Sequence, residues 1–138
     1  MHVEVSGGAV ARFNRRDIAE FTRKVLLALE RQHGLKKPLS EVSIALVDDG
    51  TMRRLNRTFR RKNKTTDVLT FPADSSGEIV ICVDQARRQA IQEKHSVATE
   101  VRYLIVHGIL HALGYDHESD NGEMNELEVD VRDAVGLE

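Results

Sequence analysis

Residues 67–83 have the sequence DVLTFPADSSGEIVICV, which predicts two β-strands joined by a turn. Residues 67–71 include valine, threonine and phenylalanine, which favour strands, and Pro72 ends the segment because it has no backbone N–H to donate. Residues 78–83 form a second apolar run, and the small polar residues 75–77 between the runs are typical of a turn. We therefore expect a β-hairpin.

Strands and helices alternate before this hairpin, and helices follow it. Residues 2–5 and 42–47 predict strands, and Asn14 and Gly34 mark the start and the end of a helix between them. Further helices are expected over residues 51–60, 84–95, 96–113 and 122–135. This order predicts an α/β fold with a mixed, mostly parallel sheet of about four strands, about five helices, and early helices as crossover connections.

The predicted helix over residues 84–95 is polar, whereas each of the others has an apolar side that we expect to face the core. In the helix over residues 51–60, Met52, Leu55 and Phe59 are expected to point inward, while most of the basic side chains point outward. In the last two helices, the residues expected to be buried are Val101, Leu104, Ile105, Leu110, Met124, Leu127, Val131 and Val135.

Length and composition predict one domain that spans residues 1–138, without repeats or a linker. Apolar residues make up 41% and charged residues 30%, as in folded soluble proteins. Cys82 is the one cysteine, which excludes an internal disulfide and a multi-cysteine zinc site. The sequence has no apolar block typical of a signal peptide or a membrane span, so we expect a cytoplasmic protein.

Charge is unevenly distributed, although the net charge is only −2. Residues 1–117 hold 19 Lys and Arg against 14 Asp and Glu, whereas residues 118–138 hold one basic residue, Arg132, against eight acidic ones. A basic cluster of seven residues lies within residues 53–64 and contains no acid; its members are Arg53, Arg54, Arg57, Arg60, Arg61, Lys62 and Lys64. Such a cluster suits either a phosphate backbone or a solvated helix face followed by a charged loop.

Three of the six histidines lie in the segment HGILHALGYDH, residues 107–117. His107 and His111 are four residues apart on the predicted helix, so their side chains point the same way. Gly114 ends the helix and lets the chain turn back, which allows His117 to supply a third nitrogen. Three imidazoles leave an open position on a tetrahedral zinc ion, where a bound water can have a pKa near 7.

Two other interpretations apply to these histidines. A histidine pair with this spacing often lies on the surface or at a helix end without a function. Gly114 and the third histidine, His117, favour a metal site. The spacing H-x-x-x-H-x-x-G-x-x-H also coincides with the metzincin zinc-protease pattern. Zinc proteases place a glutamate base after the first histidine, where this chain has Gly108. A metallopeptidase is therefore the second choice.

The histidine segment and three others resemble the bacterial YbeY family, the zinc-dependent endoribonucleases of ribosomal RNA maturation. The other segments are residues 55–60 (LNRTFR), 66–72 (TDVLTFP) and 77–82 (GEIVIC), and their order and spacing match across nearly the whole chain. The chain departs from the usual family residues at positions outside the expected metal ligands: Thr65 for proline, Thr70 for serine and Ala112 for leucine.

The resemblance implies an α/β fold with a four-stranded mixed sheet and one Zn²⁺ per chain, held by His107, His111 and His117. It also implies that Arg60 corresponds to an invariant functional arginine. The implied activity is cleavage of single-stranded RNA in 3′-end maturation of small-subunit (16S) rRNA, together with ribosome quality control. The implied partners are the small ribosomal subunit, a small-subunit ribosomal protein and an Era-type GTPase.

The chemistry of phosphodiester cleavage agrees with this role, because it requires an activated nucleophile and neutralisation of the growing negative charge. Zinc would supply the first, and Arg60 would contact phosphate through two charge-assisted hydrogen bonds. Four neighbours are expected to align the RNA strand without reading its sequence: Arg57, Arg61, Lys62 and Lys64. Aromatic residues are only 4%, so extensive base stacking and strong sequence selectivity are not expected.

The sequence leaves several roles open. Arg60 either binds phosphate or pairs with an acid such as Asp67. Asp116 either orients a histidine or caps the turn after Gly114. Besides the nuclease and the peptidase, a third hypothesis is a non-catalytic, zinc-stabilised ribosome-assembly module, which chelation would unfold.

Overall fold

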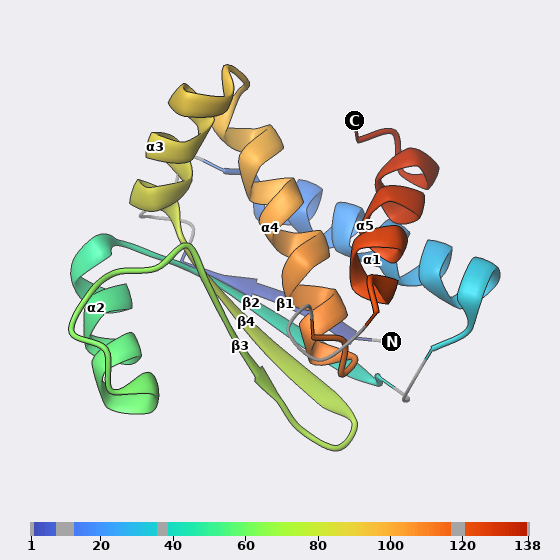
Figure 1. The fold of residues 1–138 in the computed structure, drawn as a ribbon, viewed down its shortest axis with the longest axis horizontal. Helices are drawn as coiled ribbons and strands as arrows, with labels where there is room; N and C mark the ends of the chain where they lie inside the picture. Colours follow the sequence, from blue (N-terminus) through green and yellow to red (C-terminus); the bar gives the residue numbers. More distant parts are fainter. Residues whose placement is uncertain (1, 8–12, 36–38, 117–120, 138) are drawn as a thin grey trace.

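The computed structural model of the chain describes residues 2–7, 13–35, 39–116 and 121–137 (Figure 1). Strands and helices alternate up to β3, and helices follow the hairpin. The elements are β1 (His2–Ser6), α1 (Arg15–His33), β2 (Glu41–Val47), α2 (Asp49–Arg60), β3 (Val68–Pro72), β4 (Ser76–Cys82), α3 (Val83–Glu93), α4 (Val97–Ala112) and α5 (Glu123–Ala134). The predicted α/β class and the numbers of strands and helices are confirmed for these residues.

The four strands form one mixed sheet in the order β1-β2-β4-β3. β1 pairs with β2 and β2 with β4 in parallel, while β3 pairs with β4 antiparallel. Pro72 is the last residue of β3 and lies opposite Gly77. Proline is tolerated there because β3 is an edge strand. The predicted hairpin and the mostly parallel sheet are thus confirmed.

Polar side chains cap the starts of α1 and α2 close to the predicted positions. The Asn14 side chain accepts hydrogen bonds from the backbone N–H of Arg16 and Asp17, which starts α1. Asp48 starts α2 by accepting from Thr51 N, 2.8 Å away. Helix α2 therefore begins at Asp49, two residues before the start at residue 51 that the sequence predicts.

The sheet separates two apolar clusters, because alternate side chains of a strand point to opposite faces. Ile79 and Ile81 of β4 belong to the main core, which β4 shares with α1, α4 and α5. Val80 and Cys82 belong to a smaller cluster with Met52 of α2. The helices predicted to bury apolar residues do so, and the buried ones include Val101, Leu104, Ile105, Leu110, Met124, Leu127 and Val131; Val135 is partly buried. Figure 1 shows α2 set apart from α1, α4 and α5.

The prediction that Phe59 points inward is wrong. Its side chain is 61% exposed, although Met52 on the same side of α2 is fully buried. Phe59 lies in the last turn of α2 and contacts Phe71 on the edge strand β3. Helical periodicity gives the side of a helix on which a residue lies, but it does not show where the sheet beneath that side ends.

No helix in the described ranges is both long and apolar enough to span a membrane.

Candidate active site

Helix α4 carries two of the three predicted metal-binding histidines. Ser96 caps its start by accepting from Thr99 N, and Gly114, with a φ of +97°, follows its end as predicted. His107 and His111 face each other one turn apart, with their Nε2 atoms 3.0 Å from each other. The two side chains therefore point the same way, as their spacing in the sequence predicts.

Two glycines let α4 approach the sheet closely. A Cβ at Gly108 would lie 2.7 Å from Cγ2 of Ile79, and a Cβ at Gly77 would lie 2.9 Å from the Cβ of Ala112. Both distances are too short for real side chains, so the contact requires glycine. Position 108 thus faces β4, while its neighbour His107 faces the other way, into a cavity.

The two histidines line a cavity of about 280 Å³ together with residues of β3 and the last residue of α2. It lies between α4, the edge strand β3 and the end of α2, and its lining residues are Arg60, Asp67, Val68, Thr70, Pro72, His107 and His111. Three predicted site residues, two histidines and an arginine, therefore share one cavity although they come from distant parts of the sequence.

Arg60 and Asp67 line this cavity without forming an ion pair. Within the described residues, no Arg–carboxylate contact of 4.0 Å or less joins the two side chains, and the Asp67 carboxylate accepts from the N–H of Val68 instead. The interpretation that Arg60 serves only to pair with Asp67 is thus not favoured. The Arg60 side chain is exposed and lies at the rim, where an anion can reach it.

A buried carboxylate that the sequence analysis missed holds His107. Oε1 of Glu128 lies 2.9 Å from His107 Nδ1, and its Oε2 accepts from Arg132 Nη2 at 2.8 Å. Glu128 is 5% exposed. An ionised carboxylate only accepts hydrogen bonds, so the proton is on Nδ1 and the Nε2 lone pair of His107 points toward His111.

The sequence did contain a signal for Glu128. The residue lies four positions after Met124 and three before Val131, on the apolar stripe of α5 rather than on its acidic side. A buried charged side chain needs a partner, so a glutamate on the apolar side of a helix indicates that a partner lies nearby.

A second ion pair fixes the start of α2. Arg88 of α3 donates to both carboxylate oxygens of Asp49, at 2.9 and 2.7 Å, and the Cys82 thiol donates to one of them at 3.2 Å. The hydrogen bonds from Arg88 lower the pKa of Asp49 to about 2, and burial raises the pKa of the Cys82 thiol. This contact orients the helix whose last residue is Arg60.

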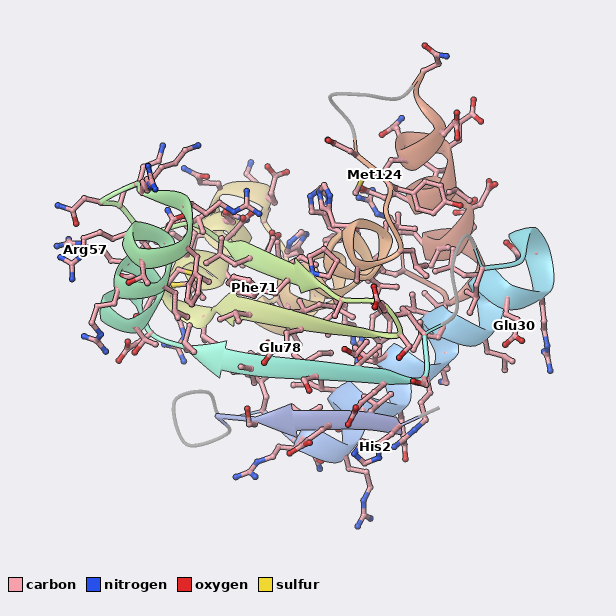
Figure 2. All side chains as sticks on the ribbon, turned by 90° about the horizontal axis from the view of Figure 1, so that it is seen from below. His2, Glu30, Arg57, Phe71, Glu78 and Met124 are labelled. Atoms are coloured by element: carbon pink, nitrogen blue, oxygen red, sulfur yellow. The ribbon has the colours of Figure 1, made fainter. Side chains whose placement is uncertain are left out.

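The remaining basic residues of the site prediction surround the end of α2. Arg57 lies in its last turn, Arg61 follows in a left-handed conformation with φ +56°, and Lys62 and Lys64 continue the loop. All four side chains are exposed, and in Figure 2 nitrogen-tipped side chains gather around α2, where Arg57 is labelled. The Asn56 amide donates to the Lys64 carbonyl at 2.9 Å, which holds this loop against α2.

Two predicted site residues follow α4 in the sequence, and only one of them is within the described residues. His117, the third predicted ligand, is outside the described residues. Asp116 is exposed on the loop after Gly114. The carboxylate 2.9 Å from His107 is that of Glu128, on α5.

The donor set of α4 suits a metal ion such as zinc. Two nitrogen ligands of a tetrahedral zinc ion lie roughly 3.3 Å apart, because each zinc–nitrogen bond is about 2.0 Å. The separation of 3.0 Å between the two Nε2 atoms is close to that value. Among the described residues no group of three or more His, Cys, Asp or Glu side chains forms a complete metal site, and His107 and His111 are the two nitrogen donors present.

Comparisons with known proteins agree with one another. The sequence profile of the family described as "Endoribonuclease YbeY" matches residues 8–136. A protein of that name from Nautilia profundicola is 46% identical over 102 residues, which cover 70% of this chain and 73% of the relative. One from Nitratiruptor sp. is 42% identical over 121 residues, covering 84% and 81%.

A solved structure extends the similarity to the fold. The solution structure of TM1509 from Thermotoga maritima is similar with a TM-score of 0.69 and 28% sequence identity, and the match covers 99% of this chain and 90% of that one. With the profile match and the sequence identity to its relatives, this chain belongs to the YbeY endoribonuclease family.

Proposed function

We propose that this chain is a metal-dependent endoribonuclease that cleaves single-stranded RNA. One observation carries the proposal: a single cavity is lined by two converging imidazoles on α4 and by the Arg60 guanidinium from the end of α2. Its relatives, which are named endoribonucleases, support the same activity. We assign this function to a single domain that spans residues 1–138.

The proposed cofactor is one Zn²⁺ per chain, with His107 and His111 as two ligands and His117 as the third. A zinc ion held there would act as a Lewis acid and lower the pKa of a coordinated water to about 7. Glu128 contributes by keeping the proton of His107 on Nδ1, so that Nε2 is available as a ligand.

Arg60 is the residue that we expect to bind the scissile phosphate. Its guanidinium presents several donors in one plane and forms two parallel hydrogen bonds with phosphate oxygens. Negative charge grows on those oxygens as the nucleophile attacks, so a fixed cation at the cavity rim lowers the barrier. Since no carboxylate in the described residues forms an ion pair with Arg60, binding phosphate breaks no existing one.

The exposed basic residues Arg57, Arg61, Lys62 and Lys64 would bind the RNA backbone on both sides of that phosphate. Such contacts position a strand but carry no sequence information, so the bound sequence must be selected elsewhere. We therefore propose that the small ribosomal subunit and its associated proteins, including an Era-type GTPase, direct this cytoplasmic enzyme to the 3′ end of 16S rRNA precursors and to defective ribosomes.

The packing of α4 argues against a metallopeptidase. A glutamate at position 108 would have to occupy the space of Ile79, because this position faces the sheet rather than the cavity. The general base of zinc proteases therefore has no counterpart at its usual position. Comparing a panel of peptides with RNA under identical metal loading tests this point: chelator-sensitive peptide cleavage with intact RNA would favour the peptidase.

His111→Ala tests the metal dependence of the proposed activity. We expect this variant to lose bound metal and RNA cleavage together, whereas the control His2→Ala, at an exposed position in β1, keeps both. Metal content is measured by elemental analysis, and cleavage is measured on matched single-stranded and duplex RNA. Full cleavage by metal-free His111→Ala would refute the proposal, as would equal cleavage of duplex RNA by the wild type.

A further inference from the structure

Phe59 is an exposed aromatic side chain beside the candidate active site. Its side chain is 61% exposed, and among the described residues it is the one exposed Phe or Tyr side chain. The next residue, Arg60, lines the cavity that holds His107 and His111. Phe59 therefore lies within one residue of the proposed phosphate-binding group.

The ring of Phe59 is held by a neighbouring strand. Phe71 of β3 contacts it with 5.1 Å between the ring centroids and 72° between the ring planes, an edge-to-face arrangement. Phe71 packs in turn against the small core under α2, and Figure 2 shows it on β3 between α2 and the end of α4. Phe59 is thus fixed on one side and open to solvent on the other. Binding a ligand therefore costs little conformational entropy of this side chain.

The surroundings of Phe59 identify the kind of ligand. Arg57, Arg60 and Arg61 flank it in sequence, all exposed, and residues 50–66 contain no acidic residue. A ligand that covers this surface must combine an apolar flat group with negative charge close by. A nucleotide has both, because its planar base and its phosphate are only one sugar apart.

We propose that Phe59 is a stacking platform for one unpaired base of the RNA, in the nucleotide next to the phosphate bound by Arg60. This inference rests on the proposed function and adds a recognition element to it. In a duplex, both faces of a base are stacked on its neighbours, so only a single strand can offer a free base to Phe59. The platform therefore provides a physical reason for single-strand selectivity.

A single platform also agrees with the low aromatic content of the chain. Every base has a π-face, so stacking on Phe59 fixes the position of the strand without selecting its sequence. The basic residues then hold the backbone, while Phe59 sets which phosphate lies at Arg60. Loss of the ring is thus expected to weaken binding and to blur the position of the cut.

Two variants test the platform directly. Phe59→Leu keeps an apolar side chain against Phe71 but removes the π-face, and we expect binding of a short single-stranded RNA to weaken on the order of 10-fold. Phe59→Trp keeps the π-face and should bind within about twofold of the wild type. Because the chain has no other tryptophan, the fluorescence of F59W reports on this position alone, and a stacked base should quench it.

Ile91→Ala is the matched control, since Ile91 is an apolar residue of α3 with 78% exposure. It should bind and cleave RNA like the wild type, and thermal unfolding should show that all variants are folded. An RNA series with one abasic position moved along the strand completes the test. The wild type should bind RNA more weakly when the abasic position is the one that Phe59 contacts. Phe59→Leu should bind that RNA as well as it binds the intact strand.

The outcomes separate this inference from the proposed function. Two results would overturn the stacking proposal while the wild type still cleaves RNA, which leaves the proposed nuclease activity intact. One is unchanged RNA binding by Phe59→Leu, and the other is unquenched fluorescence of F59W at saturating RNA. Absence of cleavage by the metal-loaded wild type overturns the nuclease. Quenching of F59W together with position-specific abasic loss supports the platform in either case.

Discussion

Glu128 determines which nitrogen of His107 carries the proton, although it comes from a helix that contributes no proposed ligand among the described residues. Its carboxylate accepts from Nδ1 of His107, and Arg132 contacts its other oxygen and lies 4.7 Å over the Tyr103 ring. This chain of contacts leads from the partly buried ring of Tyr103 to the imidazole of His107, which lines the cavity. The orientation of His107 is thus built into the packing of α4 against α5.

Glu128→Gln is expected to weaken metal binding by roughly 10-fold or more, because the proposed ligand His107 loses a charged hydrogen-bond partner. Affinity is measured by competition with a chromophoric chelator. Glu126→Gln on the same helix, at an exposed position, is the control and should bind metal like the wild type. Unchanged affinity in Glu128→Gln would show that this carboxylate does not orient the ligand.

At the scale of elements, the site depends on how closely α4 approaches the sheet and on how α2 is attached. Gly108 and Gly77 bring α4 onto β4, which places His107 and His111 beside the edge strand. Asp49 and Arg88 join the start of α2 to α3, so that its far end brings Arg60 to the same cavity. Neither contact includes a residue that lines the cavity.

Gly108→Ala should destabilise the fold by about 1–2 kcal/mol, since overpacking against Ile79 outweighs the gain of about 1 kcal/mol in helix propensity. The free energy of unfolding is measured by urea denaturation. In the control Gly50→Ala, the added Cβ meets nothing closer than 3.7 Å, so α2 should be unchanged or slightly stabilised. A Gly108→Ala variant that is more stable than the wild type would contradict the close approach of α4.

The Asp49–Arg88 contact predicts a pH-dependent contribution to stability. The pKa of Asp49 is lowered from 3.8 to about 2 in the folded chain, so its stabilising effect is present above about pH 4 and is lost toward pH 2. Both side chains are partly exposed, so the contribution is at most about 1 kcal/mol.

Asp49→Asn should therefore be less stable than the wild type at pH 7, and the difference should disappear between about pH 4 and pH 2. Urea denaturation at a series of pH values measures it, with the exposed Asp74→Asn as control. A difference that persists unchanged at pH 2 would show that the ion pair is not its cause.

At the scale of the whole molecule, we expect the fold not to depend on the proposed metal. The core under α4 consists of apolar residues such as Val101, Ile105 and Leu110, which contact the sheet and α1 rather than the site. Chelation should thus leave a folded protein with a cooperative unfolding transition. The loss in stability should be only that of ligand binding, about 4 kcal/mol at a metal concentration near 1,000 times Kd. Circular dichroism of the chelated chain tests this, and complete unfolding would favour a zinc-stabilised assembly module.

Much of the fold follows from local patterns in the sequence. Asn14, Gly34 and Gly114 mark helix ends through backbone geometry that depends on one or two residues, and strand alternation identifies the hairpin. The pair His107 and His111 was predictable for the same reason, because helical spacing alone makes them converge.

Contacts between distant segments were not predictable in this way. The partner of Glu128 depends on the packing of α5 on α4, and the exposure of Phe59 depends on where the sheet ends. The pairing of Asp49 with Arg88 joins two helices that begin where the neighbouring strands β2 and β4 end. Each requires the tertiary arrangement, which propensity and periodicity do not contain.

The most direct test of the account compares the wild type and Arg60→Ala, purified in parallel, for metal content and for cleavage of single-stranded RNA. We predict equal metal content, because Arg60 contacts the cavity from a different helix, and cleavage reduced on the order of 100-fold or more. Arg60→Lys should be intermediate, since lysine keeps the charge but not the paired hydrogen bonds. Equal cleavage by Arg60→Ala and the wild type would contradict the claim that imidazoles and guanidinium act together in this cavity.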